Sequence, residues 1–175
     1  MKSFLTGADA ARLEFDAAFA APPAVAAEEN VRLLAFRAGD DVFALRLSEL
    51  AGLHQGRRIV TVPSRTPGVL GMVGLRGRLV PVFSLPRLLG YAEGGEPRWL
   101  AACAGGREPI ALSFEHLDGY REVPRSALLM TERTAPGSTV PRAHTAELAR
   151  LGGVLVPVVS IASILETLAK KEPTP

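Results

Sequence analysis

Residues 77–89, GRLVPVFSLPRLL, return 76 positions later as residues 153–165, GVLVPVVSIASIL. Seven of the thirteen paired positions are identical, and most of the others exchange one apolar residue for another. Each copy begins with glycine, continues as a short apolar strand and reaches a serine that opens a short helix. A strand this short cannot bury its faces alone. The repeat therefore predicts two similar small β units in one chain, which favours a binding module over an enzyme with one deep cleft.

The composition suits a compact protein that does not bind nucleic acid. The chain has 175 residues, 47% of them hydrophobic, which suffices for one domain or for two small β units packed as one. Its 20 basic and 18 acidic side chains leave a formal net charge of +2, and no run of basic residues exceeds two. Nucleic-acid binders concentrate their cations, because the phosphate backbone rewards clustered positive charge. Nucleic acid is therefore not an expected partner.

The reactive side chains form no catalytic or metal-binding pattern. Cys103 stands alone in an apolar stretch, so it is predicted to be an inert core thiol. His54, His116 and His144 lie too far apart in the sequence for ligand spacing, so no metal and no other cofactor is expected. Nucleophile-elbow, zinc-protease and phosphate-loop motifs are absent from the sequence. These observations predict a protein that is not an enzyme.

No segment of the sequence predicts membrane insertion. The longest uncharged apolar runs, near residues 17–27 and 154–165, are too short to span a bilayer and contain proline. Charged residues interrupt the N-terminal stretch where a secretion signal needs an apolar centre. The expected location is therefore the cytoplasm.

Short strands separated by glycine and proline turns dominate the chain. Leu47, Leu50 and Leu53 predict about one helical turn after the second strand. Such a pattern is typical of an all-β fold with short helices at its corners, built as small barrels or a sandwich. The expected strands are 31–36, 42–47, 59–62, 71–75, 79–83, 98–104, 109–114, 120–123, 141–148 and 154–159, and the expected helices are 85–89 and 161–170.

The repeated motif carries two further structural signals. Ser84 and Ser160 are placed to cap the helices that follow them. Pro81 and Pro157 lie inside their strands, and because proline cannot donate to a strand ladder, they predict an edge strand or a bulge. Barrels this small are filled by side chains, so no ligand cavity is expected.

The N-terminal part of the chain differs from the rest. Residues 3–20 predict a helix with Phe4, Phe15 and Phe19 on one apolar face, followed by an alanine- and proline-rich linker. Two interpretations stay open: a helix packed back on its own domain, or a short partner-binding helix on a tether. The predicted organisation is a helix and linker at 1–29, a main domain of two β-barrel subdomains at 30–170 and a disordered tail at 171–175.

Two segments in the middle of the chain carry a more specific pattern. Residues 59–63 read IVTVP, residues 71–85 read GMVGLRGRLVPVFSL, and residues 43–45 read FAL. Together they resemble the CheW-type chemotaxis coupling proteins, whose pattern is Ile-Thr-x-Leu-Pro, then Gly-Val-x-Asn-Leu-Arg-Gly, then Val-Pro-Val-x-Asp-Leu-Arg. The resemblance covers roughly residues 31–168 and leaves the N-terminal helix and linker outside.

The resemblance implies a fold and a function. The fold is two five-stranded SH3-like barrels packed together, which agrees with the internal repeat. Members of the family are adaptors without catalytic activity, and they join the cytoplasmic tip of a chemoreceptor to the regulatory domain of a histidine kinase. The implied partners are therefore a receptor tip and a kinase, and assembly into rings or other homo-oligomers is left open.

The resemblance also implies where a receptor binds. Arg76 matches the family arginine beside the receptor-binding groove, and arginine is enriched among interface hot spots. The alternatives are a solvated turn arginine or a cap on a backbone carbonyl. Gly74, two positions before Arg76, belongs to the same predicted partner-binding site. Val73 and Leu75 are candidates for the groove wall, with ordinary core packing as their alternative.

Four further residues complete the predicted site. Leu50 and Leu53 match a segment that faces the receptor helix in the family, although they also suit a role in holding the barrel together. Gly71 and Gly77 are interpreted as backbone requirements, the first for a close approach and the second for a turn.

The sequence departs from the family pattern at several positions. Gly74 stands where the family has asparagine, Ser84 and Ser160 stand at aspartate positions, and Pro86 replaces an arginine. Serine still caps a helix, but a charge and an ion pair are lost. A second hypothesis follows: the chain is an interaction module outside the receptor array that binds another signalling or motility partner, such as a response regulator or scaffold, through its N-terminal helix.

Overall fold

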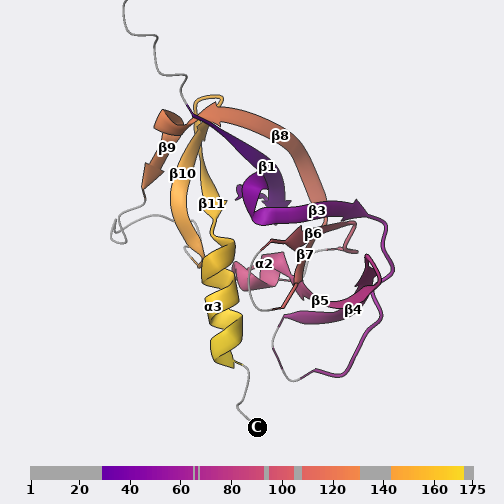
Figure 1. Ribbon diagram of the computed structural model, residues 1–175. Helices are drawn as coiled ribbons and strands as arrows, with labels where there is room; N and C mark the ends of the chain where they lie inside the picture. The colour runs from indigo at the N-terminus through magenta and orange to yellow at the C-terminus, as the bar shows by residue number, and fades with distance from the viewer. Residues whose placement is uncertain are drawn as a thin grey trace, which may run out of the picture.

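The computed structural model describes residues 29–64, 66, 68–92, 95–104, 108–130 and 143–171. The helix predicted at 3–20, its linker, residues 131–142 and residues 172–175 lie outside these ranges. The elements, shown in Figure 1, are β1 (Asn30–Ala38), β2 (Asp41–Arg46), the 3-10 turn η1 (Leu47–Glu49), β3 (Leu50–Gln55), β4 (Val69–Leu75), β5 (Arg78–Ser84), α2 (Leu85–Leu88), β6 (Trp99–Cys103), β7 (Ala111–Phe114), β8 (His116–Pro124), the 3-10 turn η2 (Arg125–Ala127), β9 (Leu128–Met130), β10 (Thr145–Leu151), β11 (Val154–Val159) and α3 (Ile161–Lys171).

The strands form two sheets with matching strand order. One sheet runs β8-β1-β2-β11-β10-β9 and the other runs β3-β6-β7-β5-β4. In each sheet a hairpin of the repeated motif, β10–β11 or β4–β5, pairs in parallel with a strand of a second hairpin, β1–β2 or β6–β7. The sequence repeat therefore marks equivalent strands of two barrels, as predicted, and the fold class is confirmed as all-β with short helices.

Two strands cross between the barrels. β3 follows β2 in the chain but pairs with β6 in the other sheet, and β8 follows β7 but pairs with β1. Figure 1 shows β3 running from the turn after β2 across to the barrel that contains β4 and β5. The first barrel also holds six strands instead of the implied five, because the short strand β9 pairs with β10. Each barrel is thus built from both halves of the sequence.

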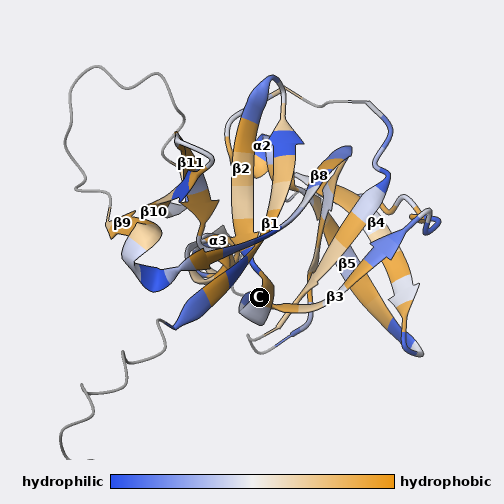
Figure 2. Cartoon of the chain, turned by 90° about the horizontal axis from the view of Figure 1, so that it is seen from above, coloured by the Kyte–Doolittle hydropathy of each residue, from blue (hydrophilic) through white to orange (hydrophobic). Residues whose placement is uncertain are grey.

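The hydrophobic core has three parts. One cluster fills the first barrel around Leu33 and Val158, and another fills the second barrel around Val80 and Leu100. The largest cluster lies between the barrels, where the sheets' outer faces and α3 meet, and Figure 2 shows the apolar stretches along the strands. In this cluster Phe36 lies 5.8 Å from Phe43 and 5.2 Å from Phe114, measured between ring centroids. The members of this central core include Leu34, Phe36, Phe43, Leu45, Phe83, Leu85, Leu112, Phe114, Val159, Ile161 and Ile164.

Two local predictions were wrong. The helical turn expected through Leu53 ends at Glu49, and β3 begins at Leu50 because residues 50–55 pair with β6. The strand expected at 59–62 is reduced to a single bridge between Val60 and Met72. Propensity alone does not decide such short apolar segments, because pairing with a neighbouring strand overrides it.

Pro81 and Pro157 each lie just before the point where their strand begins to pair with its parallel neighbour. β5 and β11 each have neighbours on both sides, so neither is an edge strand as a whole. Registered pairing with the parallel neighbour begins at Val82 in β5 and at Val158 in β11, directly after Pro81 and Pro157. The missing N–H of each proline therefore removes no bond to that neighbour.

Both serines cap their helices as predicted. Ser84 Oγ accepts the backbone N–H of Arg87 at 3.4 Å, and Ser160 Oγ accepts that of Ser163 at 3.2 Å. At α3 the backbone N–H of Ile161 also donates to Glu49 Oε2 at 3.3 Å, so a second acceptor serves the same helix end. The two acceptors satisfy amides that have no partner within the helix.

Replacing Ser160 by alanine is expected to lower the free energy of unfolding by about 1 kcal/mol, the usual value of an N-cap hydrogen bond. Ser160→Thr retains the hydroxyl and is expected to keep most of the stability. Urea denaturation of the full chain measures both variants. Equal losses for alanine and threonine would show that packing, and not the cap, is responsible.

Candidate functional site

The tip of the β4–β5 hairpin is built by two residues with left-handed backbone. Arg76 has φ of +48° and Gly77 has φ of +75°, so the turn has the positive angles that suit a tight two-residue hairpin. Arg76 is exposed, and its Nη2 donates to the carbonyl oxygen of Ala51 in β3 at 3.2 Å. The carbonyl-capping alternative is thus realised for one donor of the guanidinium, which has five N–H groups in all.

The predicted receptor-binding residues divide between the two faces of β4. Gly74 shares the outer face with Arg76, is exposed, and has open space where a Cβ would lie. Val73 and Leu75 point inward, with 2% and 7% of their surface exposed, and belong to the core of the second barrel. These two side chains therefore pack inside the barrel beneath β4 and do not form the wall of a groove on the surface.

Leu50 and Leu53 lie on β3, the strand that Arg76 reaches. Both are half-buried and pack against the central core between the barrels. The structure thus brings Arg76 together with β3 along the seam where the chain passes from one barrel to the other. Arg76 and the exposed parts of β3 form the candidate surface, and Gly74 borders it on the outer face of β4, in register with Leu79.

Each predicted structural glycine has a geometric reason. Gly71 has φ of +149°, and a Cβ there would lie 2.2 Å from the carbonyl oxygen of Val60. Gly77 has no atom within 4 Å of its Cβ position, so only its backbone angle favours glycine. Gly71 therefore permits a close approach of two chain segments, and Gly77 serves the turn.

The second barrel carries an exposed apolar row that the sequence pattern did not predict. We call the outward-facing residues Val60, Met72, Leu79 and Pro81 the β4–β5 row. Leu79 is 74% exposed and Val60 is 58% exposed. A signal existed in residues 79–83, where both faces of the strand are apolar, as expected of a strand covered on both sides.

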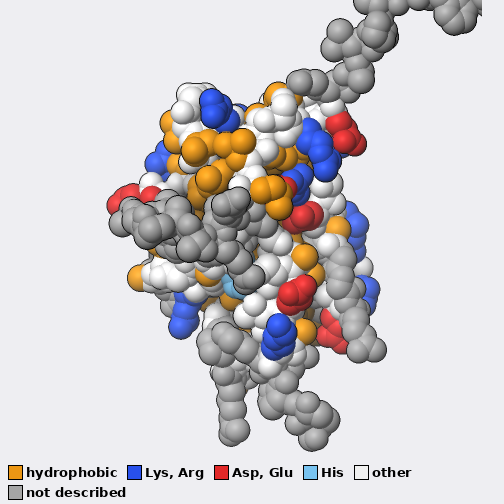
Figure 3. Space-filling model, turned by 90° about the vertical axis from the view of Figure 1, so that its left-hand side faces the viewer, with side chains coloured by type: hydrophobic (Ala, Val, Ile, Leu, Met, Phe, Trp, Pro, Cys, Tyr) orange, Lys and Arg blue, Asp and Glu red, His pale blue; other side chains and the backbone are white. Residues whose placement is uncertain are grey.

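The first barrel carries an equivalent row, 76 positions later. We call Leu129, Leu148, Leu155 and the buried Pro157 the β9–β11 row, in which Leu129 pairs with Leu148 and Leu148 pairs with Pro157. Leu155 is 48% exposed and Leu129 is 40% exposed. Figure 3, which faces the side of β9 and β10, shows hydrophobic side chains gathered over its upper half. Each barrel thus presents a similar apolar surface.

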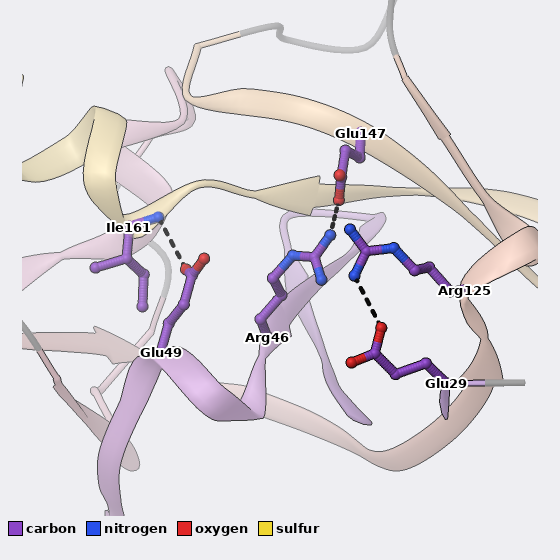
Figure 4. Close-up of polar contacts among 6 residues, drawn as sticks. All are labelled: Glu29, Arg46, Glu49, Arg125, Glu147 and Ile161. Atoms are coloured by element: carbon purple, nitrogen blue, oxygen red, sulfur yellow. Dashed lines mark hydrogen bonds and ion pairs between the residues drawn. The ribbon is translucent and has the colours of Figure 1, made fainter. Parts of the chain in front are cut away.

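Three polar contacts join β2 to β10, the start of β1 to η2, and η1 to α3, as Figure 4 shows. Arg46 of β2 pairs with Glu147 of β10, with about a fifth of each side chain exposed. Arg125 pairs with Glu29 at 3.4 Å on the surface, a contact of little energetic weight because water screens it. The third contact is the bond from the α3 amide to Glu49.

The described residues offer little reactive chemistry. Cys103 is 4% exposed, and burial, with a further contribution from the charge of Glu49, raises the pKa of its thiol to about 12. The thiolate is the reactive form, so this thiol is inert in the folded chain. Nowhere in the described ranges do three His, Cys, Asp or Glu side chains gather as a metal site. Two open surface hollows of about 330 and 430 Å³ are lined by residues other than Arg76, Leu50 and Leu53.

Among the helices that the structure describes, none has the length and apolar character needed to cross a membrane.

Comparison with known proteins places the chain in a family. The family model described as CheW-like domain matches residues 32–169. Among solved structures, the scaffolding protein TtCheW from Thermoanaerobacter tengcongensis has a TM-score of 0.66 and 13% sequence identity, over 76% of this chain and 90% of that one. The curated proteins include no match to this sequence. The structural similarity supports the two-barrel fold, and the family model covers most of the chain. The chain therefore belongs to the CheW-like domain family.

Proposed function

We propose that this chain is a non-catalytic adaptor that couples the cytoplasmic tip of a chemoreceptor to a chemotaxis-type histidine kinase. The CheW-like family consists of scaffold proteins that are generally non-catalytic. The observation that carries the proposal is the position of Arg76, exposed at a hairpin tip and directed at β3 along the seam between the barrels. Such partners place the adaptor in the cytoplasm.

The receptor contact is proposed on the surface formed by Arg76, Gly74 and β3. A helical hairpin lying along β3 would meet the half-buried Leu50 and Leu53 and the guanidinium of Arg76. An apolar helix face needs aliphatic contacts, and an arginine at the border adds directional hydrogen bonds. Gly74 leaves this surface flat, because no side chain rises from the outer face of β4 there.

The kinase contact is proposed on the apolar rows. The regulatory domain expected in the kinase has the same SH3-like fold, so barrel can pack against barrel through similar surfaces. The β4–β5 row and the β9–β11 row provide such surfaces, with Leu79 and Leu155 exposed at matching positions. Exposed apolar patches of this kind mark protein interaction sites more often than isolated apolar residues do.

The test is a pull-down from the native cytoplasm with the full-length protein as bait, read by mass spectrometry. The proposal expects a chemoreceptor and a histidine kinase to be recovered together. Arg76→Glu bait should lose the receptor and keep the kinase, because the proposed kinase contact uses the apolar rows and not the guanidinium of Arg76. Recovery of neither protein, with another signalling partner at matching stoichiometry, would contradict the proposal.

One observation favours the alternative of a module outside the receptor array. Gly74 is exposed on the candidate surface, so the missing family asparagine removes a polar group from the surface itself. Ser84, in contrast, is 4% exposed and caps α2, so its departure from the pattern is internal. Removing residues 1–28 separates the two functions. The alternative expects loss of partner binding with an intact fold, whereas the receptor–kinase adaptor expects binding to persist.

A further inference from the structure

The β9–β11 row is an apolar surface at the free edge of a sheet. Leu129 and Leu155, whose side chains lie on this surface, are 40% and 48% exposed. β9 is the last strand of its sheet in the described chain, so one side of its backbone has no strand partner there. An edge with exposed apolar side chains invites association unless something covers it.

The chain enters the fold beside this row. The carbonyl of Glu29 accepts the backbone N–H of Arg125 at 3.0 Å, and their side chains pair at 3.4 Å. Arg125 begins η2, which leads directly into β9. Figure 4 shows these two residues near the pair of Arg46 and Glu147, and Glu147 directly precedes Leu148 of the row along β10. Whatever precedes Glu29 therefore starts at the border of the row.

The preceding residues have the length and pattern needed to cover the row. Phe4, Phe15 and Phe19 share one face of the helix predicted at 3–20, which would be about 27 Å long. The linker at 21–28 spans up to about 27 Å when extended. The row crosses only three strands, roughly 10 Å in width. The segment can therefore lie on the row without strain in the linker.

The charges around the β9–β11 row also favour residues 1–28 as the segment that covers it. Residues 1–28 contain four acidic and two basic side chains, and exposed arginines, Arg125 and Arg150, border the row. The sequence that directly follows β9, residues 131–142, contains one acidic and two basic side chains and no aromatic residue. Of the two neighbouring segments, the N-terminal one is thus the better match in both charge and apolar character.

We propose that residues 3–20 form an amphipathic helix that packs its phenylalanine face on the β9–β11 row of the same chain. Two equivalent apolar rows on one chain can join copies head to tail, and such contacts grow into rings or filaments. The helix would cover one of the two rows that suit the kinase, leave only the β4–β5 row open for a partner, and so limit this growth. The inference concerns the chain alone and does not depend on the identity of any partner.

Hydrogen–deuterium exchange of the full-length chain, without receptor or kinase, tests the proposal. Wild type is compared with the full-length double variant Phe15→Asp/Phe19→Asp. Peptides covering β9 and the start of β11 are expected to exchange about tenfold faster in the variant, a difference of about 1.4 kcal/mol in opening. Peptides within residues 3–20 are expected to lose protection at the same time, because the helix is marginal without its contact surface.

A matched pair of variants controls for indirect effects. Leu155→Glu and Leu79→Glu introduce the same charge at equivalent positions of the two barrels. Leu155→Glu should release residues 3–20 as the double variant does, and Leu79→Glu should leave them protected. Equal effects of the two substitutions would overturn the proposed location.

Two other results would overturn the proposal. Exchange of residues 3–20 at unstructured rates in the wild type would mean that no helix is docked. Protection of β9 that disappears on dilution would mean that a second copy, and not the chain's own N-terminal segment, covers the row. Because no partner is present in the sample, failure here leaves the adaptor function unaffected, and failure of the pull-down leaves this inference unaffected.

Discussion

Gly71→Ala is expected to lower the free energy of unfolding by about 3 kcal/mol or more, an effect large for one added methyl group. The new Cβ would lie 2.2 Å from the carbonyl oxygen of Val60 and 2.8 Å from its carbonyl carbon. That contact is with backbone, so no side-chain rotation relieves it. The φ of +149° adds strain for any residue with a Cβ.

The same substitution would break the contact that holds residues 59–60 against β4. Val60 and Met72 exchange two backbone hydrogen bonds of 2.8 Å each, and these are the contacts that a displaced Val60 loses. Each such bond contributes about 1 kcal/mol, which adds to the steric cost. The β4–β5 row would also lose Val60, so partner binding should fall together with stability.

Two other glycines of the same hairpin serve as controls. Gly77→Ala meets no atom within 4 Å and has only the positive φ to overcome, so a loss of about 1 kcal/mol is expected. Gly74→Ala has open space and no positive φ, so it should be neutral or slightly stabilising. Urea denaturation that ranks the three losses in any other order would contradict this account of the hairpin.

The internal repeat predicted much of the architecture, because its two copies form the same local structure, a strand followed by a capped helix, in each barrel. Glycine, an alternating strand and a capping serine follow each other in both copies, and all three features depend on neighbours in sequence. The exchange of β3 and β8 between the barrels could not be predicted in this way. Strand pairing over long sequence separations depends on which surfaces the packed barrels bury, and no local pattern records that.

The candidate site was only partly predictable for a related reason. Arg76 and Gly77 could be placed in a turn from residue type, since glycine favours the positive φ of such turns. The inward direction of Val73 and Leu75 follows from strand alternation once Arg76 is known to face outward. The exposure of Leu79 could not be predicted, because both faces of its strand are apolar. Val80 and Val82 on the other face lie in the core of the second barrel, and the face of Leu79 continues at Phe83 into the central core.

Arg76→Glu is expected to weaken binding of a chemoreceptor cytoplasmic hairpin by more than tenfold, which is about 1.4 kcal/mol or more. The substitution removes the guanidinium donors from the surface beside β3 and reverses the charge there. Calorimetric titration of the purified chain with a receptor hairpin measures the loss. Arg78→Glu is the matched control: Arg78 is exposed two residues away and begins β5, in register with the inward-facing Leu75. Its effect on affinity should stay within about twofold, as for most peripheral charges.

The backbone of Arg76 permits a second variant that separates binding from folding. A residue with a Cβ at φ of +48° costs about 1 kcal/mol relative to glycine, so Arg76→Gly should keep or raise the melting temperature. The same variant should lose receptor binding as Arg76→Glu does, because the side chain is gone. Lower stability with intact binding would assign Arg76 to the fold, through its bond to Ala51. Lost binding at equal or higher stability would show that the turn accepts strain in order to present this arginine, the relation expected where function and stability compete.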